Sequence, residues 1–294
     1  MTEHAPIWQL NPTRAVRLDR PRVFSILNLT PDSFADGGRL PSPAHARDAA
    51  LRAQDEGADG LDLGAESTRP GAERIAADEQ CRRLIPAIEA IRGAGIDLPI
   101  TTDTTLASVA RAALNAGADA INDVSAGTED NTMLALAAER RCGIVLMHRL
   151  APPTEDSYSD QYSRDPEYPG GIVQAVCSFL RERVRIATDA GVPEPGILID
   201  PGLGFGKTVG QNLALIRATP DMLGVGRPVM SALSRKSFVG RAGLGRDSSP
   251  DERLAPTLAL SALHLTVGAR VFRVHDTAAH RAALDAGWHL LSQA

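Results

Sequence analysis

The chain has 294 residues, a hydrophobic content of 43%, a charged content of 23% and a net charge of −5. This length suits a single α/β barrel, and the apolar residues suffice for a sizeable core, which excludes a disordered chain. The acidic balance excludes a broad basic face for nucleic acid or an anionic membrane, so cationic groups that bind anions must gather at one site.

The N-terminal segment and the cysteines indicate the location of the protein. Residues 1–21 contain no apolar stretch typical of a signal peptide, and no apolar run reaches the ~18 residues that a membrane span needs. The three cysteines lack CxxC spacing, which favours free thiols over a disulfide framework or a zinc site. We therefore expect a cytoplasmic protein with no nucleic-acid and no membrane partner. We interpret residues 1–21 as an N-terminal extension, forming a hairpin that closes the bottom of a barrel.

A short sequence unit recurs along the chain. A glycine begins each unit and a polar residue stands five places later in Gly57–Asp62, Gly117–Asn122, Gly143–His148 and Gly268–Arg273, while Gly196–Asp200 is one residue shorter. The glycine suits the left-handed cap that ends a helix, and the apolar residues after it suit a short, buried, parallel strand. The polar residue then falls at the C-terminal end of the strand.

Eight segments are predicted to be strands, in chain order Val23–Leu29, Gly60–Gly64, Pro99–Thr104, Ala120–Val124, Gly143–His148, Ile197–Asp200, Pro228–Leu233 and Val271–His275. Amphipathic stretches between them predict helices, such as Ala44–Glu56, Asp78–Arg92, Leu106–Ala116, Ile172–Ala190 and Glu252–Val267. This alternation indicates a parallel sheet covered by helices. Because eight similar units fit and no dinucleotide fingerprint is present, we predict a single-domain α/β fold, a (β/α)8 TIM barrel over residues 22–294, rather than an open sheet. The chemistry of such barrels lies at the C-terminal ends of the strands.

Polar residues end all eight predicted strands, which a ligand explains better than solvation does. Asp103, Asn122 and Asp200 offer acceptors and one amide, which match the donor edge of a flat heterocycle such as a 2-amino-pyrimidinone. The cationic side chains near other strand ends can hold anions, and they are Arg69, Arg235, Lys236, Arg273 and His275. A ligand with a guanidine-like ring edge and a phosphate tail would satisfy both groups. A generic sugar-phosphate enzyme would explain the anion-binding group alone.

Two further segments are predicted to be loops. Residues 201–208 resemble a nucleotide-binding P-loop, but Pro201 stands where that pattern requires glycine. We interpret this run as a glycine-rich loop that leaves the strand ending at Asp200. Residues 150–171, rich in Pro, Tyr, Ser and Asp, show no helical or strand period and are expected to form a loop over or beside the site.

Eight ordered segments of the chain match motifs of one enzyme family. Two are loops, ILNLTPDSFADGG from Ile26 to Gly38 and DLGAESTRPGA from Asp62 to Ala72. The others are Asp103-Thr, Ile121-Asn-Asp, Leu146-Met-His, the run from Ile199 to Lys207, Ser234-Arg-Lys and Arg273-Val-His-Asp. Together the matches span residues 22–277, and their order makes them far more specific than any one motif. These segments resemble those of the dihydropteroate synthases, the barrel enzymes of folate synthesis, and the first two resemble that family's signature loops.

The resemblance implies an enzyme that condenses 6-hydroxymethyl-7,8-dihydropterin diphosphate with 4-aminobenzoate to give 7,8-dihydropteroate and pyrophosphate. It implies a pterin site formed by Asp103, Asn122, Asp200, Lys236 and Met147. The catalytic residues would be Asp103, Lys236 and Asp200. A diphosphate site would comprise Asn28, Arg69, Arg273 and His275. The 4-aminobenzoate site would comprise Ser67, Thr68, Arg69, Pro70, Phe205, Ser234 and Arg235.

The same resemblance implies a Mg²⁺ cofactor and a homodimer. Asn28 would be the metal ligand, shared with the diphosphate. The loops Thr30–Leu40 and Glu66–Glu73 contain glycine and proline among polar residues, which is typical of mobile loops. We expect these loops to close over the bound substrates.

Three positions depart from the family's pattern. Ala65 and Ala232 stand where glycine is common, so one extra methyl group at each position would narrow the pocket. Arg149 follows His148 where a Met-x-Gly run is more usual, which leaves the conformation of the next loop open.

Two other functions are alternatives. A corrinoid-dependent methyltetrahydrofolate methyltransferase shares a pterin-binding barrel, but it has no use for the loop 67–70 or for a diphosphate site. A non-enzymatic paralogue, acting as a regulatory subunit, would usually lose loop or charged residues that are all present in this chain.

Overall fold

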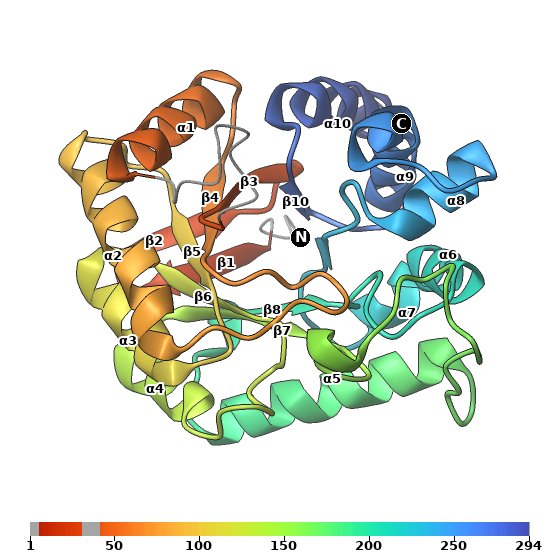
Figure 1. Ribbon diagram of the computed structural model, residues 1–294, viewed down its shortest axis with the longest axis horizontal. Helices are drawn as coiled ribbons and strands as arrows, with labels where there is room; N and C mark the ends of the chain where they lie inside the picture. The colour runs from red at the N-terminus through yellow and green to blue at the C-terminus, as the bar shows by residue number, and fades with distance from the viewer. Residues whose placement is uncertain (1–5, 31–41, 294) are drawn as a thin grey trace.

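The strands of the protein form a nearly closed barrel. The computed structural model describes residues 6–30 and 42–293. Eight parallel strands lie in the order β8-β7-β6-β5-β4-β3-β10-β9, and a bridge between Ile199 and Val229 joins the two ends of this order. Helices surround the strands (Figure 1). The predicted (β/α)8 barrel is therefore confirmed.

The barrel strands are β3 (Arg22–Asn28), β4 (Gly60–Gly64), β5 (Ile100–Asp103), β6 (Ala120–Asp123), β7 (Gly143–Met147), β8 (Ile197–Asp200), β9 (Met230–Ser231) and β10 (Val271–Val274). The helices are α1 (Pro43–Asp55), α2 (Ala77–Gly93), α3 (Ala107–Ala116), α4 (Met133–Arg140), α5 (Ile172–Asp189), α6 (Val209–Arg217), α7 (Thr219–Leu223), α8 (Ser237–Leu244), α9 (Leu254–Thr266) and α10 (Thr277–Ser292). Short 3₁₀ helices occupy Pro153–Glu155, Glu194–Gly196 and Pro250–Arg253.

Strand β9 is shorter than predicted. The sequence predicts a strand over Pro228–Leu233, whereas β9 comprises two residues, Met230–Ser231. Pro228 has no N–H to donate to a neighbouring strand. At the other end the chain turns at Arg235, whose φ is 60°. The residues that follow β9 therefore leave the sheet and enter the loop at the C-terminal end of the barrel.

The repeated glycines mostly adopt the predicted left-handed conformation. Gly57, Gly117 and Gly268 have φ values of 86°, 116° and 116°, so each can end a helix before a strand begins. The unit that begins at Gly143 differs, because Arg141 takes the left-handed conformation with a φ of 49°. Gly143 instead begins β7 in a crowded place, since a Cβ atom there would lie 2.8 Å from the backbone oxygen of Gln9.

An N-terminal hairpin covers the N-terminal end of the barrel interior. Strands β1 (Ile7–Asn11) and β2 (Arg14–Arg17) pair antiparallel. Apolar side chains of this segment form a cluster with inward-facing residues of six barrel strands: Trp8, Leu10, Val16 and Leu18 pack with Phe24, Ala120, Val145, Leu198, Met230 and Val271. The Trp8 indole also donates a hydrogen bond of 3.0 Å to the backbone oxygen of Gly196. The hairpin therefore fills the end of the barrel opposite the predicted site.

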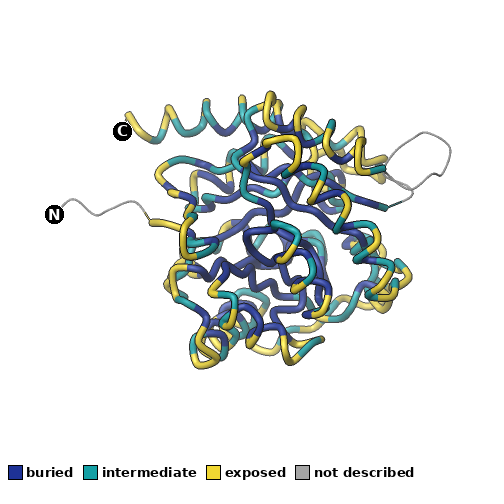
Figure 2. The backbone as a smooth tube through the Cα atoms, turned by 90° about the vertical axis from the view of Figure 1, so that its left-hand side faces the viewer, coloured by how far each residue is buried: buried dark blue, intermediate teal, exposed yellow. Residues whose placement is uncertain are grey.

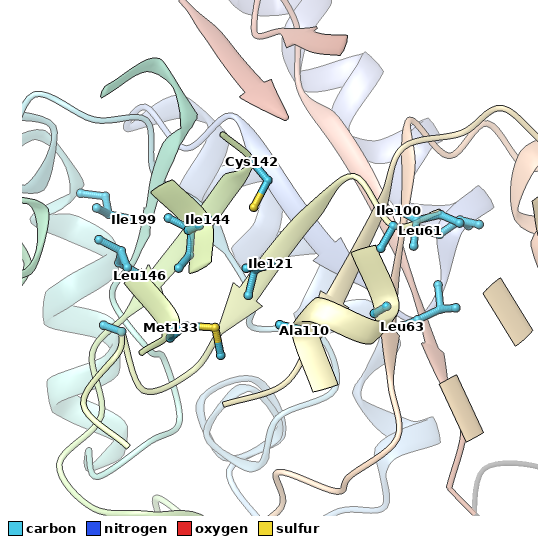
Figure 3. Close-up of a cluster of buried hydrophobic side chains, with 14 of the residues drawn as sticks. Leu61, Leu63, Ile100, Ala110, Ile121, Met133, Cys142, Ile144, Leu146 and Ile199 are labelled. Carbon is cyan, nitrogen blue, oxygen red and sulfur yellow. The ribbon is translucent and has the colours of Figure 1, made fainter. Parts of the chain in front are cut away.

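The strand period separates the core from the site. Leu61 and Leu63 of β4 and Ala65 after it are fully buried in the main core, between the strands and the helices (Figure 3). Asp62 and Gly64 alternate with them and therefore face the barrel interior. The methyl group of Ala65 thus lies in the core and does not narrow a pocket, contrary to our expectation. Figure 2 shows the buried strands at the centre, with exposed residues on the outer helices.

The hairpin contacts generate a stability prediction. Trp8→Ala should lower the free energy of unfolding by about 3–5 kcal/mol, because it removes a buried ring and leaves a cavity. The Trp8 and Phe24 ring centroids lie 5.5 Å apart. The control is Ile7→Ala, since Ile7 is 42% exposed and its loss should change stability by less than about 0.5 kcal/mol. Urea denaturation measures the free energy of unfolding of both variants. Equal losses of stability would contradict the role of Trp8 in filling the end of the barrel.

Candidate functional site

Buried acids and an amide lie together at the C-terminal end of the barrel. Asp62, Asp103, Asn122 and Asp200 end or nearly end four strands and are only 2%, 6%, 3% and 3% exposed. Asp103 lies opposite Asn122 in the β5–β6 register, and Asp200 lies opposite Met147 in the β7–β8 register. The structure therefore brings the predicted acceptor set onto one surface of the barrel interior. Gly64 lies opposite Asp103 in the β4–β5 register.

Arg273 supplies the counter-charge for two of these acids. Its guanidinium donates to Asp62, and its Nη2 lies 2.6 Å from Asp103. Asp62 also accepts hydrogen bonds from Thr101 and from the Asn122 amide, the latter at 3.3 Å. Burial raises the pKa of Asp103 to about 7, although the Arg273 charge opposes this shift. Arg273 lies on the acid side of the site, so the structure places a predicted diphosphate residue beside the predicted pterin residues.

Lys236 lies beside Asp200 and the glycine-rich loop. Its ammonium donates to the backbone oxygen of Leu203 and lies 4.2 Å from the centre of the Phe205 ring, a cation–π contact. Burial lowers the pKa of Lys236 to about 8, with the Asp200 carboxylate opposing this shift. Burial also raises the pKa of Asp200, which the Lys236 charge and the hydrogen bond from Gly202 N–H oppose. The predicted pterin residues thus include a neighbouring acid–amine pair.

A buried lysine holds the glycine-rich loop against β7. The Lys207 ammonium contacts the backbone oxygens of Phe205 at 2.7 Å, Gly202 at 2.9 Å and His148 at 3.3 Å, and the His148 ring nitrogen at 3.0 Å. The three glycines of this loop have positive φ values, which permits its tight winding around the ammonium. Lys207 therefore holds the loop whose Leu203 oxygen and Phe205 ring Lys236 contacts.

The segment predicted as a loop beside the site packs on the same glycine-rich loop. Asp156 accepts a hydrogen bond of 2.9 Å from the Gly206 N–H, and the Tyr168 hydroxyl donates to the Gly206 oxygen at 2.5 Å. Val124, Met147 and Phe205 form a small apolar cluster at this end of the barrel. A flat ring could rest on this cluster while the acids contact its edge.

The predicted anion-binding residues separate into two groups. His275 lies by Ser234, whose Oγ accepts from the His275 N–H at 3.2 Å and lies 3.1 Å from its ring nitrogen. Desolvation by the surrounding protein and the charges of Arg273 and Arg235 lower the pKa of His275, although the residue is solvent-exposed. Arg235 instead pairs with Asp276 and with Asp251, at 2.9 Å from the latter. Arg235 is thus engaged by loop acids.

The second signature loop is anchored by several contacts. Glu66 accepts from the Ile75 N–H at 2.8 Å and from Arg74 at 3.1 Å, which closes the base of the loop. The Gly71 N–H donates to the Pro153 oxygen at 2.7 Å near its tip. These anchors hold Ser67, Thr68, Arg69 and Pro70, of which Arg69 is exposed. The first signature loop, predicted over Thr30–Leu40, falls outside the described residues from residue 31 to its end.

Sequence reasoning left several functional contacts out of the site. Asp62 was noted only as a strand-end acid, yet it contacts Arg273 and Asn122. Lys207 belonged to a run discarded as a nucleotide loop, yet its ammonium holds that loop in place. The available signals were the inward strand position of Asp62 and the fact that Lys207 and Lys236 are the two lysines of the chain.

Comparison with known proteins identifies the family. The sequence profile described as "Pterin binding enzyme" matches residues 24–275. A dihydropteroate synthase of Streptococcus pyogenes is 42% identical over 259 residues, which cover 88% of this chain and 91% of the relative. The chain belongs to the dihydropteroate synthase family. The chain is accordingly an enzyme, a transferase of folate biosynthesis.

Solved structures of dihydropteroate synthases share the fold over nearly the whole chain. The Xanthomonas albilineans enzyme with 4-aminobenzoic acid has a TM-score of 0.87 and 40% identity, covering 99% of both chains. A second structure of that enzyme, in complex with 7,8-dihydropteroate, has a TM-score of 0.83 and 38% identity, covering 97% of this chain and 99% of its own. These similarities extend beyond the barrel to the N-terminal hairpin, because they cover almost every residue.

The lysine environment generates a titration prediction. Burial and the nearby Lys236 charge lower the pKa of Lys207 to about 7, from an unfolded value of about 10.4. Because the folded state then binds fewer protons, the contribution of Lys207 to stability is present above the unfolded pKa and is lost as the pH falls through about 7. Lysine-selective ¹³C labelling should give two Cε signals, assigned with Lys207→Met, that titrate near pH 7 and pH 8. Two Cε signals whose shifts show that both lysines stay protonated up to pH 10 would contradict the lowering of the lysine pKa values by burial.

Proposed function

We propose that the C-terminal end of this barrel binds 6-hydroxymethyl-7,8-dihydropterin diphosphate and 4-aminobenzoate and joins them, releasing pyrophosphate and 7,8-dihydropteroate. The observation that carries this assignment is the surface shared by Asp103, Asn122, Asp200 and Lys236, with Arg273 beside it. Solved relatives in complex with 4-aminobenzoic acid, the second substrate, and with 7,8-dihydropteroate, the product, support this reaction.

The acids and the amide would bind the edge of the pterin ring. Asp200 and Asp103 are acceptors for the ring's amino and N–H groups, and Asn122 can both donate and accept. Hydrogen bonds from the pterin would favour the ionised form of each carboxylate, which offsets the rise in pKa that burial causes. Met147 would contact the ring face, and Lys236 would donate to a ring acceptor while it neutralises Asp200.

The diphosphate would lie next to Arg273 and His275, and Arg69 would contact it from the second signature loop. Asn28 ends β3 and is partly exposed, and its amide oxygen is a hard ligand of the kind that Mg²⁺ accepts. Among residues 6–30 and 42–293, no cluster of three His, Cys, Asp or Glu suits a metal ion. One protein oxygen therefore fits an ion that is held mainly by diphosphate and water. When bound, Mg²⁺ would neutralise charge on the leaving diphosphate.

The 4-aminobenzoate would be held between the two loop systems. Ser67, Thr68, Arg69 and Pro70 would contact it from the second signature loop. Phe205 and Ser234, which are both buried, would complete this site, with Phe205 offering an apolar face. Arg235 would act through the loops, since its guanidinium pairs with Asp276 and Asp251.

The reaction is a substitution at the pterin's exocyclic CH₂ group. The C–O bond to diphosphate breaks, the arylamine nitrogen forms the C–N bond, and the nitrogen then loses a proton to solvent. Positive charge develops on the pterin as diphosphate leaves, so Asp103 stabilises it from a fixed position. Arg273 and His275 bind the leaving group by charge and hydrogen bonding. No side chain acts as a nucleophile, and positioning supplies much of the rate.

Two finer expectations complete the proposal. A homodimer rests on the family resemblance. A cytoplasmic location is supported by the cysteines, since Cys81, Cys142 and Cys177 are all free thiols. Within the described ranges, no helix is both long and apolar enough to cross a bilayer.

A coupled assay of pyrophosphate release tests the proposed function. The purified enzyme with Mg²⁺, the pterin diphosphate and 4-aminobenzoate should release one pyrophosphate for each 7,8-dihydropteroate formed. Omission of either organic substrate should abolish pteroate formation. Methyl transfer from methyltetrahydrofolate to a corrinoid protein, without pyrophosphate release, would replace this proposal with the alternative pterin enzyme.

Asp200→Asn should weaken pterin binding by more than tenfold. The Gly202 N–H lies 2.7 Å from one carboxylate oxygen of Asp200, and the amide oxygen of asparagine could still accept that hydrogen bond. The second carboxylate oxygen becomes an NH₂ group, which is a donor that faces the N–H groups of the pterin. Calorimetry with a non-reactive pterin measures the loss. Asp189→Asn is the matched control, because Asp189 pairs with Arg185 at the exposed end of α5. A loss smaller than tenfold would show that Asp200 does not anchor the pterin.

Lys236→Ala and Arg235→Ala should have different effects, although the residues are adjacent. Lys236→Ala should mainly weaken pterin binding, because the ammonium lies beside Asp200 inside the barrel. Arg235→Ala should mainly raise the KM for 4-aminobenzoate, because it frees Asp276 and Asp251 and loosens the loops that they connect. Steady-state kinetics with each substrate varied separates the two outcomes. Equal losses for both substrates in both variants would contradict this division.

A further inference from the structure

A chain of alternating charges connects four consecutive loops at the C-terminal end of the barrel. It runs from Glu66 after β4 to Arg74 in the same loop, then to Glu129 after β6 and Arg149 after β7. Arg74 also donates to Thr105 Oγ1 after β5 at 3.0 Å. The two acids and two arginines have no net charge together, so each charge has an opposite partner.

Glu129 is the centre of this chain. One of its carboxylate oxygens, Oε1, contacts both Arg74, at 2.8 Å, and Arg149. Burial alone would raise the pKa of Glu129, but a hydrogen bond from Thr105 and the charges of both arginines outweigh it and lower the pKa. The Arg149 side chain is 8% exposed and that of Glu129 is 20% exposed. Water screens this pair less than it screens a surface pair.

The same chain closes the base of the second signature loop. Arg74 binds Glu66 from the far end of that loop, and Glu66 also accepts from the Ile75 N–H. The tip is held by the hydrogen bond from Gly71 N–H to Pro153, four residues after Arg149. One anchor of the loop, Pro153, therefore comes from the segment that follows β7, which lies beside it in Figure 1. Arg149 of the same segment reaches the loop through Glu129 and Arg74.

We propose that Arg149 is a positioning residue for 4-aminobenzoate: through Glu129 and Arg74 it holds the loop Glu66–Ile75, and thereby sets the KM for the arylamine without contacting either substrate. This proposal rests on the proposed function, which assigns Ser67–Pro70 to that substrate. Arg149 was a departure from the family's usual pattern in the sequence, and the charge chain accounts for it.

The test compares Arg149→Met and Glu129→Gln with the wild-type enzyme. Each variant keeps much of the side-chain volume and removes one charge from the chain. We expect the KM for 4-aminobenzoate to rise by roughly fivefold, while kcat and the KM for the pterin diphosphate stay within about twofold. Arg149→Met combined with Arg74→Met should resemble the more affected single variant, because both act through one carboxylate.

Arg111→Met is the matched control. Arg111 pairs with Glu139 between α3 and α4, and its side chain is 47% exposed, so its loss should leave both KM values unchanged. Hydrogen exchange of the intact protein supplies a readout that does not depend on activity. Amides of residues 66–75 should exchange faster in Arg149→Met than in the wild type or the control, because their anchors are weaker.

The outcomes separate this proposal from the function on which it rests. A higher arylamine KM with faster exchange in residues 66–75 supports the positioning role. An unchanged arylamine KM, or equal increases in both KM values, overturns it. A wild-type enzyme that releases no pyrophosphate overturns the proposed function, and this role with it, before any variant is compared.

Discussion

The site depends on keeping several carboxylates ionisable while they are buried. Asp62, Asp103 and Asp200 lie inside the barrel, where an uncompensated charge would cost several kcal/mol. Arg273 compensates the first two and Lys236 the third. Arg273 and Lys236 therefore serve to neutralise the buried acids as well as to bind the substrates. A substrate that brings its own N–H donors and a negatively charged tail can replace part of this internal pairing.

The frame that holds these charges is rigid for ordinary packing reasons. The hairpin fills one end of the barrel interior, and outward leucines and isoleucines join the strands to the helices. The loops at the other end carry function but are not free of constraint. Lys207 ties the glycine-rich loop to β7. The second signature loop was expected to be mobile from its glycines and prolines, yet Glu66, Gly71 and Arg74 all anchor it.

The sequence predicts the fold well because the glycine cap, the buried strand and the polar strand end recur together. The inward position of Asn122 and Asp200 follows from that repeat alone, whereas Asp103 is placed by the predicted strand Pro99–Thr104. Their roles came from family resemblance, because strand position cannot reveal which ligand an acid meets. Contacts such as that between Arg273 and Asp62, 211 positions apart, depend on barrel closure and side-chain length, which no local pattern reports. The short β9 was missed because its ladder is limited by Pro228 and by the turn at Arg235.

The scarcity of lysine has a practical consequence. The chain contains 31 basic residues of the Lys and Arg type, and Lys207 and Lys236 are its two lysines. One is fully buried and the other lies within the site. An amine-directed coupling reagent therefore finds, apart from the N-terminus, no lysine on the outer helices to react with. Immobilising or labelling this enzyme through amines would direct the reaction to its N-terminus or its active site. A reagent that reacts with guanidine groups would not have this selectivity, because the surface carries many arginines.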